Sequence, residues 1–563
     1  MKEMLYFGFV ELYEKLNSTT KKLEKISILA DFLKELGEKG KDEWIYLIKG
    51  RVLPEYDVRQ FGISRQLTIK AIGSAFGIKD EEIYKRLRKI GDLGEIAEEF
   101  AGKKHQSRLF SSKLYVSKVF SNLNKLFSIG GKGSVGKKIA LVSEILGSAS
   151  GKEAKYIVRT LLEDLRVGVA DGIIKDAIAE AFFPDEKKEM EELIESAYDL
   201  SSDYAVVFSS ARKGKSELKK IDIVPGRPMN VMLAVKAEDI DDAFRICGTP
   251  LAIEYKYDGF RMLINKDGDK YSLFTRNLED VTKQFPDVID VVKKNIHGES
   301  FILDSEVVGY DPKSKKYKPF EAVSQRIKRK HDIDKLVREL PVEINVFDVL
   351  YYNGKSYLSV LFKERRKLLE KIVKKIHLKI QPAKQIIVSD KKQAEKFYEE
   401  ALKAGEEGIV VKNLNAHYRH GRKVGYIAKL KPSAKDFDLV IVGAEYGNGK
   451  RAGWLTSYII ACKSGEKFLE IGKVSSGLKE KSEEGTTYDE MTKLLKPLIT
   501  KTGNNYVSVE PKIVVTVIYQ NIQKSPSYNS GYALRFPRIT TYRPDRKTKD
   551  IATLEDVERD VKK

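Results

Sequence analysis

The sequence predicts a multidomain protein with three units in series: an all-α N-terminal domain, a central α+β domain and a C-terminal β-barrel. The length of 563 residues supports several domains, because domains average roughly 150 residues. Apolar residues recur at helical spacing in the first part of the chain, whereas short runs of β-branched and aromatic residues dominate after Val224. The segment VPGRPMN at 224–230 separates the two patterns and has the proline and glycine content of a linker.

The N-terminal domain is expected over residues 1–224. In STTKKLEKISILADFLKEL, Leu23, Ile26, Leu29 and Leu33 follow each other at steps of three or four residues, which predicts one apolar face of a helix. The segment GKEAKYIVRTLLEDLRVGVADGIIKDAIAEAFF continues this pattern. We therefore expect this domain to be mostly helical.

The two remaining domains are expected to contain strands. Between 229 and 433, the runs LAIEYKYDG, SFILDSEVVGY, EINVFDVLYY and GIVVKN favour strands, KDGD favours a hairpin turn, and helical stretches such as KERRKLLEKIVKKI intervene. This pattern predicts an α+β domain with mostly antiparallel pairing. Residues 434–563 contain FDLVIVGAEY, TSYIIACK and KIVVTVIYQ with frequent glycine turns, which predicts a small β-barrel.

The composition limits the classes of partner and compartment. A net charge of +20 favours a polyanionic partner, either nucleic acid or an anionic membrane. No apolar run reaches the ~20 residues of a membrane span, so we expect no membrane anchor. The two cysteines lie far apart, which favours a reducing compartment, the cytoplasm, over a disulfide framework. The 33% of charged residues is compatible with the ion-paired surface of a thermophile.

The segment EYKYDGFR is the first candidate for chemistry. On a strand, Glu254, Lys256 and Asp258 would share one face, because side chains alternate. A lysine is a nucleophile only when neutral, and carboxylates favour its charged form, so a nucleophilic Lys256 needs other cations or a metal ion nearby. The short pattern K-x-D-G is weak evidence without such groups, and a surface ion pair is the alternative.

Other segments offer the missing groups. In FILDSEVV, Asp304 and Glu306 would share a strand face, and in INVFDVLYYNG the ring of Phe347 is suited to stacking on a purine. Lys429 and Lys431 in YIAKLKP share one strand face and would suit a phosphate. Further charged candidates are Arg276 in FTRNLED, and Glu407 and Lys412 in GEEGIVVK. Each has an ordinary structural alternative, but their joint occurrence favours a site.

These segments resemble a known family. KYDGFR, TRNLED, LDSEVV, FDVLYYNG, EGIVVK and KLK resemble, in this order, the nucleotidyltransferase motifs of ATP-dependent DNA ligases. DLRVGVADGIIKDAIAEAF looks like the helical DNA-binding domain of that family, and LRFPRITTYRPDRK looks like its C-terminal OB-fold. The resemblance covers nearly the whole chain and is closest to the archaeal and eukaryotic replicative type. It implies a DNA-binding domain over 1–224, an adenylation domain over 229–433 and an OB-fold over 434–563.

The resemblance also implies a role for each matching residue. Lys256 would attack the α-phosphate of ATP and carry AMP covalently. The residues expected to bind the nucleotide are Glu254 at adenine, Phe347 stacked on adenine, Arg261 and Arg276 around the ribose and phosphates, Glu306 at the ribose, and Lys423, Lys429 and Lys431 at the phosphates. Glu306 and Glu407 would bind Mg²⁺, since hard cations prefer oxygen ligands, and Arg543 and Arg546 would assist adenylation.

Two of the departures from the family pattern concern charged residues. Lys423 stands where the family usually has arginine, with Arg422 beside it, and a lysine does not reproduce the bidentate fork of arginine. Either residue therefore remains a candidate for that role. Arg546 stands where lysine is expected, which keeps the charge.

Two glycine-rich loops and one short segment have competing interpretations. GKGSVGK at 131–137 fits the outline of a P-loop, but Lys138 replaces the hydroxyl residue that would hold Mg²⁺, so a contact with DNA phosphate is preferred. GAEYGNGK at 443–450 is better explained as a hairpin. HQSRLFSS resembles the clamp-binding segment of archaeal ligases, with Gln106, Leu109 and Phe110 as anchors, and an ordinary loop is the alternative.

The sequence therefore predicts a cytoplasmic, monomeric archaeal enzyme that uses ATP and Mg²⁺, through an AMP intermediate, to seal nicks in double-stranded DNA during replication, repair and recombination. A sliding clamp is the expected protein partner. The alternatives are an RNA ligase or a capping guanylyltransferase, which share the K-x-D-G core, and a non-catalytic nucleic-acid scaffold. The use of ADP or NAD⁺ besides ATP stays open.

Overall fold

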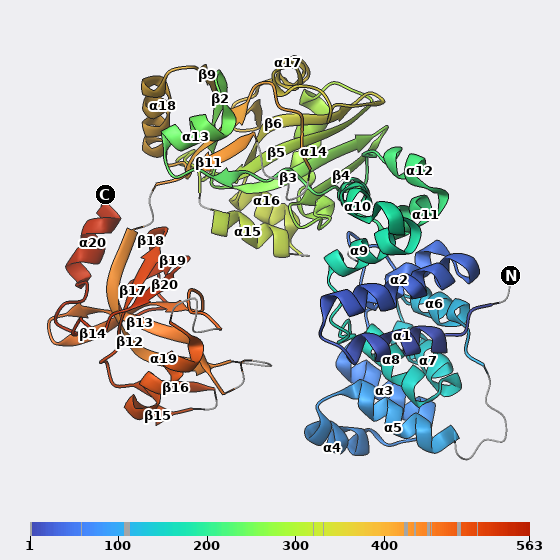
Figure 1. Ribbon diagram of the computed structural model, residues 1–563. Helices are drawn as coiled ribbons and strands as arrows, with labels where there is room; N and C mark the ends of the chain where they lie inside the picture. The colour runs from blue at the N-terminus through green and yellow to red at the C-terminus, as the bar shows by residue number, and fades with distance from the viewer. Residues whose placement is uncertain are drawn as a thin grey trace. The chain divides into compact units, whose positions relative to one another are not determined.

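The chain forms two compact units, Met1–Lys431 and Pro432–Lys563 (Figure 1). The structure, a computed structural model, describes residues 3–57, 59–105, 113–318, 320–329, 331–420, 426–432, 435–447, 451, 453–480, 486–503 and 505–562. No helix in these ranges is long and apolar enough to cross a membrane.

Helices build the N-terminal part of the first unit, as the apolar periodicity predicts. In α2 (Lys22–Lys39), Ile26, Leu29 and Leu33 are buried in one continuous core. Leu23 departs from the prediction, because it is 74% exposed. Steps of three residues fall short of a helical turn of 3.6, so Leu23 lies roughly 120° around the helix from Leu29 and has left the buried face.

The other helices of this part contribute to that core, except η3, which has no buried residue. They are α1 (Phe7–Asn17), η1 (Asp42–Lys49), α3 (Arg65–Phe76), α4 (Asp80–Ile90), α5 (Leu93–His105), α6 (Val116–Lys125), η2 (Leu126–Ser128), α7 (Ser134–Ser148), α8 (Gly151–Leu161), α9 (Asp171–Phe182), η3 (Pro184–Glu186), α10 (Lys187–Ser201), α11 (Tyr204–Lys213) and α12 (Lys215–Lys219).

Two sheets follow in the same unit. The first has the strand order β1-β11-β10-β2-β9, with only β1 and β11 parallel among its pairs, and the second has the order β4-β3-β5-β6-β7, with β8 parallel to β6. The strands are β1 (Val235–Lys236), β2 (Leu251–Lys256), β3 (Phe260–Asp267), β4 (Lys270–Thr275), β5 (Ser300–Gly309), β6 (Val342–Tyr352), β7 (Lys355–Ser356), β8 (Ile380–Pro382), β9 (Gln385–Val388), β10 (Gly408–Asn413) and β11 (Ile427–Leu430).

Helices accompany these sheets, and the pairing is mostly antiparallel, as expected. They are α13 (Ile240–Cys247), η4 (Thr282–Gln284), α14 (Pro286–Asn295), α15 (Phe320–Lys328), α16 (Ile333–Glu339), α17 (Phe362–Ile372) and α18 (Lys391–Lys403).

The turn between β2 and β3 carries the chain from one sheet to the other. Lys256 is the last residue of β2, and Phe260 is the first residue of β3. A Cβ added at Gly259 would lie 2.4 Å from the carbonyl oxygen of Val307 in β5, so this turn requires glycine. Asp258 lies in the turn and not on the strand face that the sequence predicted for it, because β2 has already ended.

The second unit is rich in strands and confirms, with the helical first part and the mixed central part, the predicted fold class. Its larger sheet has the order β14-β13-β12-β16-β15, with β17 joining β12 to β20. The strands are β12 (Lys435–Tyr446), β13 (Leu455–Ser464), β14 (Lys467–Val474), β15 (Ile499–Thr502), β16 (Tyr506–Val509), β17 (Val514–Tyr519), β18 (Asn521–Lys524), β19 (Tyr532–Arg535) and β20 (Arg538–Tyr542). The unit also contains α19 (Tyr488–Leu495), η7 (Lys496–Leu498) and a C-terminal helix, α20 (Leu554–Lys562), which the sequence prediction omitted.

Gly408→Ala should destabilise the first unit by about 2 kcal/mol or more. Gly408 has φ of +141°, and an added Cβ would lie 2.1 Å from the carbonyl oxygen of Leu430 in β11. Urea unfolding followed by circular dichroism measures the change. Gly136→Ala in α7 is the control, because its Cβ would have no atom within 4 Å. A Gly408 variant as stable as this control would contradict the explanation.

Candidate active site

Lys256 lies beside a carboxylate from the neighbouring strand region. Its Nζ donates a hydrogen bond to Glu407, and the backbone N–H of Glu407 donates to the carbonyl of Lys256 at 2.9 Å. Lys431 Nζ lies 2.9 Å from the same carboxylate oxygen. Burial would raise the pKa of Glu407, but the ammonium groups of Lys256 and Lys431 outweigh it and lower that pKa to about 2. Glu407 is therefore ionised at neutral pH and joins two lysines.

Further positive charge gathers around this pair. Burial lowers the pKa of Lys429 in β11 from its ordinary value, and the nearby cations Lys256, Lys431 and Arg276 lower it further. Arg276 comes from the segment after β4, in the other sheet. The fold thus brings together the cations that a nucleophilic Lys256 requires.

A second pair of carboxylates lies on β5. Asp304 is fully buried, and its carboxylate accepts hydrogen bonds from Arg261 Nε at 2.9 Å and Nη2 at 2.5 Å and from the Tyr418 hydroxyl at 2.9 Å. Burial raises the pKa of Glu306 to about 7; Lys256 and Arg261 oppose this rise, and Asp304 and Glu407 add to it. The cations near Glu306 therefore do not fully compensate the negative charge of its carboxylate, which leaves a deficit of positive charge.

This deficit fits a divalent cation. Glu306 and Glu407 influence each other electrostatically, and both offer carboxylate oxygens, the donors that Mg²⁺ prefers. Within the described part of the chain, no group of three or more His, Cys, Asp or Glu side chains forms a protein-only metal site. A magnesium ion here would take its other ligands from phosphate oxygens or water.

The side chains expected to contact a base, Glu254 and Phe347, lie around Lys412. Glu254 is 2% exposed, and its carboxylate oxygens contact Gln385 Nε2 at 2.8 Å and Lys412 Nζ at 2.7 Å. Lys412 Nζ also lies 4.7 Å from the centre of the half-buried Phe347 ring. Glu254 and Phe347 are therefore both in contact with Lys412. The carboxylate expected to bind the edge of the base and the ring expected to stack on its face thus lie close together.

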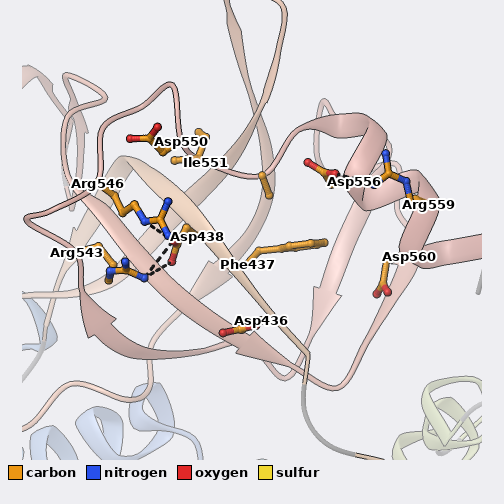
Figure 2. Close-up of a pocket in the computed structure, with 11 residues that line it drawn as sticks. Asp436, Phe437, Asp438, Arg543, Arg546, Asp550, Ile551, Asp556, Arg559 and Asp560 are labelled. Carbon is orange, nitrogen blue, oxygen red and sulfur yellow. Dashed lines mark hydrogen bonds and ion pairs between the residues drawn. The ribbon is translucent and has the colours of Figure 1, made fainter.

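Arg543 and Arg546 lie in the second unit, where they line a pocket of about 550 Å³ (Figure 2). Arg543 donates to Asp438 at 3.2 Å and to Asp545 at 2.6 Å, and Arg546 Nε lies 3.5 Å from Asp438. Asp438 therefore orients both arginines on one wall of the pocket.

Some predicted residues cannot be placed. Lys423 and the neighbouring Arg422 lie outside the described residues, and so do Gln106, Leu109 and Phe110. Their roles stay predictions.

Three further residues that surround the site lie outside the motifs named from the sequence. Gln385 faces Glu254 because β9 pairs with β2 in a register that places the two residues opposite each other. Tyr418 bonds Asp304 from an irregular segment, and Arg366 approaches Glu254 from α17. None stands in a segment whose pattern indicates a binding role, so only strand register and packing reveal them.

The site combines a strand lysine, acidic neighbours and several cations with a ring and a buried carboxylate. This combination is typical of nucleotidyltransferases. Comparisons with known proteins are more specific. The domain family described as DNA ligase N terminus matches residues 5–179, ATP dependent DNA ligase domain matches 231–431, and ATP dependent DNA ligase C terminal region matches 451–546. The chain belongs to the family of ATP-dependent DNA ligases, of the archaeal type.

Similar proteins support this assignment along the full length. A DNA ligase of Nanoarchaeum equitans is 45% identical over 98% of this chain and 97% of its own length, and a DNA ligase of Thermococcus onnurineus is 39% identical over 99% and 97%. A solved structure titled Pmar-Lig_PreS3 is similar over 95% of this chain and 99% of its own, with a TM-score of 0.55 at 17% identity, which supports the fold.

Glu306→Gln should change the pH dependence of stability. A glutamate in an unfolded chain has a pKa of about 4.3. Since the folded pKa is about 7, the folded protein binds a proton that the unfolded chain has lost between these values. The free energy of unfolding of the wild type should therefore rise as the pH falls from 8 to 5. Glu306→Gln should be more stable than the wild type by roughly 1–2 kcal/mol at pH 8, with the difference fading near pH 5.

Urea unfolding in EDTA at several pH values measures this difference. The exposed Glu299→Gln serves as the control. A difference between Glu306→Gln and the wild type that is constant with pH would rule out the raised pKa as its cause.

Proposed function

We propose that Lys256 carries AMP in an ATP-dependent DNA ligase that seals single-strand nicks in duplex DNA. The observation that supports this most directly is the position of Lys256 Nζ, which bonds Glu407 beside Lys431 and Lys429. The cations would attract the phosphates of ATP to the site of Lys256. The net charge of +20 is consistent with a DNA substrate.

The reaction has three steps. Lys256 Nζ attacks the α-phosphorus of ATP and forms a P–N bond. The P–O bond between the α-phosphorus and pyrophosphate breaks, and pyrophosphate leaves. The 5′-phosphate of the nick then attacks the AMP phosphorus, which frees the lysine and forms a phosphoanhydride. Finally the 3′-hydroxyl attacks the 5′-phosphate, the phosphodiester forms, and AMP leaves.

The surrounding residues have separate proposed tasks. Glu254 binds the adenine edge, and Phe347 stacks on the base, because a carboxylate accepts hydrogen bonds from an amino group and a ring offers a flat apolar face. Glu306 and Glu407 hold Mg²⁺, which neutralises phosphate charge when bound. The cations proposed to contact ribose or phosphates are Arg261, Arg276, Lys423, Lys429 and Lys431, and those proposed to assist adenylation are Arg543 and Arg546.

The proposal also extends to the organisation of the chain. The helical region 1–224 binds DNA, and the region 229–433 carries out the adenylation of Lys256. The region 434–563 is the OB-fold that contains Arg543 and Arg546. We propose that the enzyme acts as a monomer in the cytoplasm, consistent with its buried, separate cysteines.

Lys256→Ala should abolish labelling of the protein by ATP radiolabelled at the α-phosphate. The label stays on the protein in a denaturing gel only if a covalent bond has formed, and removal of the nucleophile leaves no site for it. Lys270→Ala, at an exposed lysine of the β3–β4 hairpin, should be labelled like the wild type. Label that survives in Lys256→Ala would refute the role of Lys256.

The same preparations assign the substrate and the cofactor. Nicked duplex DNA should be sealed by the wild type, whereas nicked RNA and RNA 5′ ends should remain unchanged. Labelled ADP and NAD⁺ in parallel reactions define the range of nucleotides. A wild type that is labelled but leaves nicked DNA unsealed would contradict ligation.

We also propose that the segment with Gln106, Leu109 and Phe110 binds a sliding clamp. Phe110→Ala should reduce clamp binding in a pull-down by about tenfold or more, because a buried aromatic anchor dominates such interfaces. Sealing of nicks without the clamp should stay unchanged. Equal clamp binding by the wild type and the variant would exclude this segment.

A further inference from the structure

One buried N–H group near the proposed base site has no hydrogen-bond partner. Arg366 in α17 is 9% exposed; its Nη2 donates to the carbonyl of Ala383 at 2.9 Å, and its Nε donates to Glu370 Oε1 at 2.7 Å. Its Nη1 has no partner among the described residues, and Glu254 Oε1, at 3.6 Å, is beyond hydrogen-bond length. A buried donor without an acceptor destabilises the folded protein, so a ligand that offers an acceptor would gain affinity here.

The orientation of Glu254 does not depend on Arg366 Nη1. Gln385 Nε2 donates to one oxygen of Glu254 at 2.8 Å, and Lys412 Nζ lies 2.7 Å from the other. The free donor therefore lies beside a carboxylate that other residues already hold. Together they offer a ligand one hydrogen-bond donor and one strong acceptor at adjacent positions.

The surroundings favour a base over a phosphate as that ligand. The charges of Arg366 and Lys412 are matched by those of Glu254 and Glu370, so the local net charge is close to zero. The unmatched cations lie elsewhere, around Lys429. The ring of Phe347 lies within contact of Lys412, so a flat ligand on that ring would have its edge near Glu254.

We propose that Arg366 determines base specificity by donating a hydrogen bond from Nη1 to a ring nitrogen of adenine. Glu254 accepts from the amino group, and Arg366 donates to N1, the ring nitrogen beside the amino group. Adenine N1 is an acceptor, guanine N1 carries a hydrogen, and N7 is an acceptor in both bases. This inference rests on the proposed function. Guanine carries an oxygen in place of the amino group, and that oxygen would face the Glu254 carboxylate. The pair of residues therefore selects adenine by both attraction and repulsion.

The test is covalent labelling of the full chain with ATP, 1-deaza-ATP, 7-deaza-ATP and GTP. Arg366→Met should raise the KM for ATP about tenfold or more, with kcat for labelling changed less than about twofold, because a binding contact is lost and the chemistry is not. The ATP-over-GTP preference should fall about tenfold. 1-Deaza-ATP should be as good a substrate as ATP for Arg366→Met but not for the wild type, and 7-deaza-ATP should match ATP for both proteins.

Two controls separate base recognition from structure. Glu370→Gln weakens the partner of Arg366 Nε but leaves Nη1 in place, so it should keep the ATP-over-GTP preference. Lys367→Met, at a side chain 72% exposed on the same helix, should match the wild type. A lower kcat with unchanged KM in Arg366→Met would mean that Arg366 acts structurally.

The wild type provides a test that does not depend on folding of the variants. If it uses ATP and 1-deaza-ATP equally well, N1 is not recognised and the inference is wrong. If the losses from Arg366→Met and from 1-deaza-ATP are additive, Arg366 does not contact N1. A wild type that ATP does not label at all would instead overturn the proposed function.

Discussion

The candidate site depends on one backbone constraint, the passage of the chain from one sheet to the other within the turn at 257–259. Gly259 allows this turn to approach the Val307 carbonyl, and Gly408 allows β10 to approach the Leu430 carbonyl. With both approaches in place, the strand pairing sets Gly408 opposite Lys256. The carboxylate of Glu407, one residue earlier, then reaches the lysine. Larger residues at either glycine would separate the nucleophile from its carboxylate.

Charge compensation organises the rest of the site. Glu407, Asp304 and Glu254 are each paired with a cation from a different element, which offsets the cost of burying these carboxylates. Glu306 is the exception, because burial outweighs the neighbouring cations and raises its pKa to about 7. The site therefore has a region with excess positive charge, a carboxylate that lacks a cation, and a nearly neutral region around Glu254. These three environments match the phosphates, the metal and the base of a nucleotide.

Much of the fold followed from local patterns. Apolar spacing predicted the helical region, and runs such as SFILDSEVVGY predicted β5. Leu23 was misplaced because periodicity over a few residues does not show where the buried face ends. Asp258 was misplaced because alternation on a strand says nothing about the residue at which the strand stops. The helix α20 was omitted because strand patterns dominate the sequence before it.

The sequence alone established the family, the order of the motifs and the chemical types at the site, since these are carried by short local segments. Tertiary structure was needed for the contacts between the segments. Lys256 and Glu407 are 151 residues apart, and only the register of β2 and β10 makes them neighbours. Gln385 and Arg366 stand in no motif and reach Glu254 through pairing and packing of β9 and α17. Local propensity does not encode such long-range register, because it arises from the burial of whole strands and helices against one another.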